Sequence, residues 1–221
     1  MQNNYNGLIE KKFRPEIEGV RALAALMVAV YHIWIGKVSG GVDVFFVISG
    51  FLITTTLISR LQYKGELDIK GYLLNLARRL IPLSFLVLFF IVIASYMLLP
   101  EVRWSETIKE FIATAFYYEN WQLANTSVDY LANNSEQSPV QHYWAMSIQG
   151  QFYVIWAVVI AFCVLIGKYL FKNISKRKLF LSVLVTLFLI SLIYSIYITA
   201  INQPWAYFDT FTRLWEFSLG G

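Results

Sequence analysis

The stretch 21–54 constrains this chain most. It holds two long apolar runs, and a few polar residues interrupt them: Arg21, His32, Asp43 and Ser49. A soluble core could not bury apolar runs of this length. Ionisable groups are costly inside a membrane, so those that persist there are candidates for a functional role. The stretch therefore indicates a membrane protein with a polar site inside its helices.

The composition supports a membrane protein. The 221 residues are 57% hydrophobic and 14% charged, whereas soluble domains carry about 25% charged residues. The net charge of +4 is spread over separate loops, so we expect no nucleic-acid partner. The single Cys163 excludes an internal disulfide and a cysteine metal cluster, and we expect no metal. The first 16 residues are polar, and we expect no cleavable signal peptide.

The apolar runs predict an all-α fold, a polytopic transmembrane helical bundle with about five full spans and a partial sixth. A span needs about 20 apolar residues. Residues 108–124 are aromatic-rich but carry Lys109, Glu110 and Glu119, so we expect an interfacial or re-entrant helix there. The expected spans are 19–35, 42–58, 81–99, 143–166 and 179–201, with the partial sixth starting near 208 and Pro82 in the first turn of the third.

The lysines and arginines predict the orientation of the spans. Four lie before the first span or at its start, five in 60–79 and five in 168–178, whereas 100–142 has two against six acidic residues. Positive loops remain on the cytoplasmic side. We therefore expect a multi-pass plasma-membrane protein with a cytoplasmic N-terminus, provided that 108–124 does not cross the membrane.

The spacing of Arg21 and His32 places them on one helix face. They are eleven residues apart, and eleven steps of about 100° return to nearly the same direction over a rise of roughly 16 Å. Asp43 begins the second span at nearly the depth of His32. A carboxylate near a histidine can fix its tautomer and raise its basicity, as a general base requires.

Other polar residues fall at the same two depths. On the cytoplasmic side, Arg78 and Arg79 join Arg21 in a cationic group that suits phosphate. The outer polar cluster consists of Ser49, His142, Gln149, Gln151, Tyr153, Arg213 and Glu216.

Structural interpretations of these residues remain open. Arg78 and Arg79 could be positive-inside anchors. Arg213 and Glu216 could form a structural ion pair, and His32 could bond to a neighbouring helix. The shared face and the shared depths favour the functional interpretation.

Five ordered blocks resemble the membrane-bound acyltransferase 3 family, which O-acylates sugars of bacterial surface glycans. Two departures stand out: Asn75 replaces a usual arginine, and Gln149 and Gly150 replace a usual pair of glutamates. The blocks read RPEIEGVRALAALMVAVYH, GGVDVFFVISGFLIT, YLLNLARRLIP, HYWAMSIQGQFY and TRLWEFSLGG.

The resemblance implies an O-acyltransferase that moves an acyl group, usually acetyl, from cytoplasmic acyl-CoA to a glycan hydroxyl outside the membrane. On this basis His32 is the general base or a transient acyl carrier, and Asp43 orients it. Arg21, Arg78 and Arg79 hold the phosphates of CoA, which is a donor substrate rather than a bound cofactor. The outer polar cluster then lies on the acceptor side, and the implied partners are a carbohydrate and the lipid bilayer.

The resemblance also bears on the extent of the domain. Family members usually have more spans, sometimes followed by an extracellular esterase-like domain. We therefore expect 1–221 to be the N-terminal part of a single acyltransferase 3 domain, truncated at its C-terminus, with an esterase-like domain separate or missing. A transporter or exporter of a glycan or acyl precursor and an inactive remnant remain alternatives. Peptidoglycan, O-antigen, exopolysaccharide and secondary-metabolite acceptors all remain open.

Overall fold

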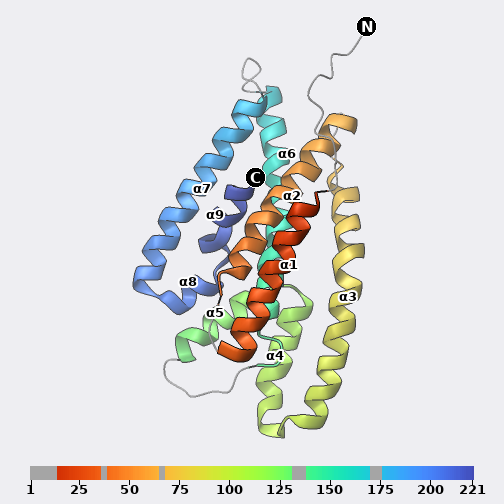
Figure 1. The fold of residues 1–221 in the computed structure, drawn as a ribbon, viewed down its shortest axis with the longest axis vertical. Coiled ribbons are helices and arrows are strands. Elements are labelled where there is room, and N and C mark those ends of the chain that lie inside the picture. The colour runs from red at the N-terminus through yellow and green to blue at the C-terminus, as the bar shows by residue number, and fades with distance from the viewer. Residues whose placement is uncertain (1–13, 36–38, 65–67, 131–137, 170–175) are drawn as a thin grey trace. The chain divides into compact units, whose positions relative to one another are not determined.

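A computed structural model describes residues 14–35, 39–64, 68–130, 138–169 and 176–221 (Figure 1). These residues form helices and turns, without a strand among them. The helices are α1 Pro15–Val30, the π-helix η1 Tyr31–Ile35, α2 Gly41–Lys64, α3 Ile69–Leu98, the 3-10 helix η2 Glu101–Arg103, α4 Trp104–Ala115, α5 Glu119–Tyr130, α6 Tyr143–Tyr169, α7 Lys176–Ile201, α8 Gln203–Phe208 and α9 Thr210–Gly220.

Five helical segments are long and apolar enough to cross a membrane. They are Pro15–Ile35, Gly41–Leu61, Ile69–Leu98, Tyr143–Tyr169 and Lys178–Ile201. The prediction of an all-α, polytopic helical protein is therefore confirmed. The partial sixth span expected near residue 208 corresponds to the short helices α8 and α9.

The third span begins earlier than its apolar run. Arg78 and Arg79 lie inside α3 rather than in the loop before it, so the helix has 30 residues. Pro82 is consequently inside the helix and not in its first turn, which corrects the prediction. The apolar run predicted the later part of α3, whereas the helix also includes the polar residues before it.

The segment 108–124 is two helices and not one. Tyr117 has a φ of 60°, in the left-handed region. The amide of Tyr118 donates to the Ala113 carbonyl and that of Tyr117 to the Thr114 carbonyl, which is the Schellman pattern that ends a helix. Glycine usually occupies this position, so a tyrosine there gave no sequence signal for the end of α4.

The chain packs as two compact units. The first consists of Met1–Asp68, Ile155–Ile190 and Leu214–Gly221, and the second of Ile69–Val154 and Ser191–Arg213. Each unit is described by itself below. The expected single domain over 1–221 stays a prediction.

In the first unit, α1 lies along α2 (Figure 1). Gly41, the first residue of α2, makes this close approach possible. A Cβ added there would lie 2.6 Å from the Ala24 carbonyl oxygen and 2.8 Å from Val28 Cγ2. The start of α2 is thus held against the last turns of α1.

The first unit also packs the end of α9 against α2. The rings of Phe46 and Phe217 stack with centroids 4.7 Å apart. A Cβ at Gly50 would overlap the Phe217 backbone, and one at Gly220 would overlap the Val47 backbone. Small residues let two helix backbones approach this closely inside a membrane.

In the second unit, side chains fix the chain around α8 and α9. The Asn202 side chain accepts a hydrogen bond from the Trp205 amide and caps α8. Asp209 precedes α9, and its Oδ1 accepts from the Phe211 amide at 2.8 Å. Its Oδ2 accepts from the Tyr194 hydroxyl of α7 at 2.9 Å. These bonds hold α8 and the first turn of α9 in place.

We expect Gly50→Ala to lower the free energy of unfolding by about 1–3 kcal/mol, because the added Cβ meets backbone atoms that cannot rotate away. Gly19→Ala is the matched control, since a Cβ there meets nothing within 4 Å. Thermal unfolding of the detergent-solubilised protein measures both. An equal effect of the two variants would contradict the packing of α9 on α2.

Candidate active site

His32 lies in the π-helical turn that follows α1, and its ring is half-buried. Its Nδ1 is 2.8 Å from the Val28 carbonyl oxygen. A carbonyl oxygen only accepts, so Nδ1 is the donor and carries a proton. When the ring is neutral, the lone pair is on Nε2. This is the tautomer in which Nε2 can take a proton from a hydroxyl.

The π-helical turn itself changes the expected geometry. The prediction that Arg21 and His32 share a face assumed 100° per residue throughout, but the α-helix ends at Val30. The wider turn of a π-helix changes the direction of His32 relative to Arg21. Single π-helical turns are often found at functional sites.

Asp43 is half-buried in the first turn of α2. It lies two residues after Gly41, and Gly41 contacts the turn of α1 that carries Val28. Asp43 and His32 therefore both belong to the packed pair α1 and α2. The Val28 carbonyl is enough to fix the tautomer of His32, so the orienting role of Asp43 stays a prediction.

Arg21 forms an ion pair that the sequence analysis missed. Its Nη1 lies 2.9 Å from both carboxylate oxygens of Glu18. The spacing of three residues on one helix was the available signal. The other two predicted cations, Arg78 and Arg79, are exposed on α3 of the second unit.

Ser49 of α2 and Glu216 of α9 are both buried in the first unit. Their exposed fractions are 6% and 1%. A buried carboxylate is costly unless it is compensated, so Glu216 suits a functional role as well as a structural one. Arg213 belongs to the second unit, and the ion pair predicted between the two stays a prediction.

Gln151 is the centre of a hydrogen-bond network in the second unit. Its Nε2 donates at 2.8 Å to the Tyr117 carbonyl and at 2.8 Å to Asn120 Oδ1. Its Oε1 accepts from Trp121 Nε1 at 3.2 Å and from the Thr210 hydroxyl at 2.5 Å. All four bonding positions of the amide are used, so Gln151 ties α6 to α5 and to the start of α9.

Asn120, which is completely buried, extends this network. Its Nδ2 donates at 3.0 Å to the Phe208 carbonyl and at 3.0 Å to the Thr210 hydroxyl. Asn120 and Thr210 gave no signal in the sequence, because neither stands out from the polar residues around it. A fully bonded buried network of this kind rigidifies its surroundings.

The remaining predicted residues of the outer polar cluster also lie in the second unit. Gln149 Nε2 donates to the Tyr153 hydroxyl at 2.6 Å. The Arg213 guanidinium lies 5.0 Å from the centre of the Tyr207 ring and 5.9 Å from that of Trp144, in the range of cation–π attraction. His142 is exposed just before α6. These residues of the second unit thus offer amides, hydroxyls and a cation held by aromatic rings.

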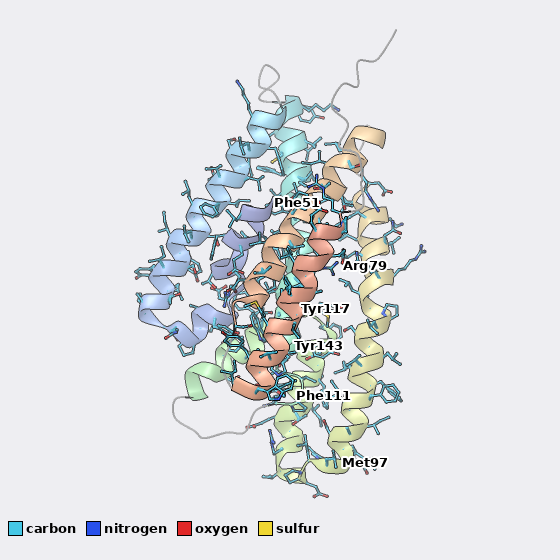
Figure 2. The ribbon with its side chains drawn as sticks, in the orientation of Figure 1. Phe51, Arg79, Met97, Phe111, Tyr117 and Tyr143 are labelled. Carbon is cyan, nitrogen blue, oxygen red and sulfur yellow. The ribbon has the colours of Figure 1, made fainter. Side chains whose placement is uncertain are left out.

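Gly150 departs from the family pattern, and its surroundings explain why a side chain is absent. A Cβ there would lie 2.6 Å from Cδ1 of the Tyr117 ring. The left-handed turn at Tyr117 brings this ring against α6, in the part of the second unit that also holds Tyr143 (Figure 2). The ring therefore occupies the space that a glutamate at position 150 would need.

Glu119 is a buried carboxyl group at the start of α5, with an exposed fraction of 0%. Burial, and to a lesser extent the nearby Glu110 carboxylate, raises its pKa from the usual 4.5 to about 9. The Thr114 hydroxyl opposes the shift without offsetting it. Glu119 is consequently protonated at neutral pH. The sequence analysis treated it only as an interruption of an apolar segment.

Metal ligands were not expected. Within the described residues, no three His, Cys, Asp or Glu side chains form a group that could hold a metal ion.

The fold and the site define a class of molecule: a polytopic helical membrane protein with polar groups on its helices. The comparisons with known proteins agree with this class. Residues 14–221 match the family model described as an acyltransferase domain. The chain therefore belongs to the acyltransferase 3 family, and the resemblance found in its sequence is confirmed. No solved structure matches it.

Two curated relatives illustrate the similarity. The peptidoglycan O-acetyltransferase OatA of Listeria monocytogenes is 32% identical over 216 residues, which cover 95% of this chain and 33% of the relative. The O-acetyltransferase OatA of Staphylococcus aureus is 33% identical over 212 residues, which cover 95% of this chain and 34% of the relative. The chain thus spans about a third of the length of these relatives.

The raised pKa of Glu119 predicts a pH-dependent stability. The unfolded chain loses this proton near pH 4.5 and the folded protein only near pH 9. The folded state therefore loses stability as the pH rises between these values. We expect Glu119→Gln to remove this loss and to stabilise the protein at pH 7 by up to about 3 kcal/mol.

Thermal unfolding at a series of pH values between 5 and 9 measures this effect. Glu101→Gln, at an exposed carboxylate of the same unit, is the control and should keep the slope of the parent protein. Parallel curves for the parent and Glu119→Gln would contradict a buried, protonated Glu119.

Proposed function

We propose that this chain transfers an acyl group, in particular acetyl, from acyl-CoA on the cytoplasmic side of the plasma membrane to a hydroxyl of a carbohydrate on the outer side. Membership of the acyltransferase 3 family supports the reaction type. The five segments able to span a membrane suit a reaction between substrates on its two sides. The positive loops support a cytoplasmic N-terminus.

The observation that carries the proposal is the hydrogen bond from His32 Nδ1 to the Val28 carbonyl. It leaves Nε2 with the lone pair. As a general base, Nε2 takes the proton of the acceptor hydroxyl, and the hydroxyl oxygen attacks the thioester carbonyl. The C–S bond breaks, and the CoA thiolate leaves and takes up the proton. The products are an O-acyl ester and CoA. Transient acylation of Nε2 itself is the alternative order of steps.

The donor binds, in this proposal, through its phosphates. Arg21 of the first unit and, separately, Arg78 and Arg79 of the second unit offer guanidinium groups, which pair with phosphate in a bidentate manner. Arg21 is bonded to Glu18, so a phosphate would replace that carboxylate. The ion pair is partly exposed, and such pairs contribute little to stability. Replacing the Glu18 carboxylate by a phosphate therefore costs little free energy.

The acceptor, in this proposal, is the glycan of peptidoglycan. The relative from Listeria monocytogenes carries that substrate in its name, and 95% of this chain matches a third of that relative. The outer polar cluster offers amides and hydroxyls of the kind that bind sugar hydroxyls, and Arg213 lies against the rings of Tyr207 and Trp144. Asp43 would favour the charged imidazole during proton transfer.

We expect His32→Ala to reduce acyl transfer at least about 100-fold, the usual worth of a general base. The measurement follows labelled acetyl from acetyl-CoA to peptidoglycan in membranes that carry this chain. Trp34→Phe is the matched control, because Trp34 is an exposed residue of the same π-helical turn.

Three outcomes would count against the proposal. Unchanged transfer in inserted His32→Ala would remove His32 as the base. Movement of a glycan or acyl precursor without consumption of acetyl-CoA would indicate a transporter. The absence of transfer by the inserted parent chain would indicate that these residues alone are not the catalytic unit.

A further inference from the structure

Four buried oxygen atoms around the turn between α4 and α5 have no hydrogen bond of good geometry in the described part of the chain, although the Thr114 hydroxyl lies close enough to Glu119 to lower its pKa. They are Thr114 Oγ1, Tyr117 Oη and both carboxyl oxygens of Glu119. The Thr114 and Glu119 side chains are 1% and 0% exposed. A buried polar atom without a partner is costly, so it usually marks an unseen ligand, water or ion. Four such atoms within six residues indicate a place built to bind something.

The turn that carries these oxygens is held firmly by its surroundings. The Schellman bonds fix Tyr117 and Tyr118. Gln151 holds the Tyr117 carbonyl and Asn120, the residue after Glu119. Local folding therefore does not require Thr114, Tyr117 and Glu119 to be polar, since the bonds of the turn come from other groups.

The chemistry of the three side chains selects the class of ligand. At neutral pH Glu119 is a carboxylic acid, and Thr114 and Tyr117 carry hydroxyls, so each both donates and accepts hydrogen bonds. An anionic ligand would be repelled by the nearby Glu110 carboxylate, and an apolar ligand would leave the oxygens without partners. Neighbouring hydroxyls of a sugar match this mixture of donors and acceptors.

We propose that Thr114, Tyr117 and Glu119 form a subsite that binds hydroxyl groups of a carbohydrate. In this structure the subsite is closed. Tyr117 is the residue that can open it, because its ring is only half-buried. Rotation of this side chain, with the backbone still held by its hydrogen bonds, would expose the other oxygens.

The subsite extends the proposed function, and it rests on that function for the kind of sugar involved. A glycan acceptor would be held here through hydroxyls that do not react. Glu119 is then a binding residue of the acceptor and not a base. Its neutral state matters because a charged carboxylate would accept hydrogen bonds without donating any.

The test measures binding of a labelled tetramer of N-acetylglucosamine to the detergent-solubilised chain by equilibrium dialysis. We expect saturable binding, a loss of at least about tenfold in affinity for Glu119→Leu, and a change of less than about threefold for Glu119→Gln, which still donates and accepts. The exposed control Glu101→Gln should bind like the parent protein.

The leucine variant separates binding from folding. Replacing an unbonded buried carboxyl by an apolar group of similar size should leave stability unchanged or higher. If Glu119→Leu does not fold, the same binding measurement on Thr114→Val tests the subsite. We expect this variant to lose about threefold or more in affinity for the tetramer. Unchanged affinity in the folded variant, or no saturable binding by the parent protein, would overturn the subsite.

Failure of the subsite and failure of the proposed function give different results. His32→Ala should bind the tetramer like the parent protein, because His32 belongs to the other unit. If His32→Ala loses acyl transfer but still binds the tetramer, the result tests the proposed reaction. If Glu119→Leu changes tetramer binding while His32 is intact, the result tests the subsite.

Discussion

A polar group inside a membrane has little water to bond to, and this constraint governs the structure. Its bonds must come from the chain or from a ligand. The ring of His32 meets the constraint through the carbonyl one turn earlier in its own helix. Gln151 meets it with four bonds, to α5, to the start of α9 and to the turn before α5. The same requirement that stabilises these side chains also fixes their chemical state.

For His32 the consequence is functional. Because the Val28 carbonyl can only accept, the bond decides which ring nitrogen carries the proton. The Val28 carbonyl of α1 therefore supports the tautomer that base catalysis would need. Asp43 can then act on the charge that develops on the ring, rather than on its orientation. Gly41 contributes by bringing the start of α2 against the same turn.

The spans were predictable from the sequence because a lipid environment demands long apolar runs, and these are easy to recognise. The ends of the helices were less so. The start of α3 was missed because Arg78 and Arg79 resemble loop residues, although a helix can extend beyond the apolar region. The end of α4 was missed because a tyrosine holds a conformation that usually signals glycine.

The candidate site was predictable where one helix carries it and unpredictable where distant segments meet. His32 and Asp43 were predicted from spacing and depth, and both belong to the packed pair α1 and α2 with the turn that follows α1; their catalytic roles stay predictions. Glu18 was detectable from its spacing to Arg21 but was overlooked. Asn120 and Thr210 meet Gln151 only through the fold, so no local pattern points to them. Glu119 gained its raised pKa from burial, which periodicity did not reveal for so short a helix.

Transfer across the membrane is the central claim, and sealed vesicles of known orientation test it most directly. Labelled acetyl-CoA is supplied on one side and the glycan acceptor on the other. The account predicts an acetylated acceptor when the donor is on the cytoplasmic face and the acceptor is on the opposite face. Acetylation only when both substrates share one side would contradict it.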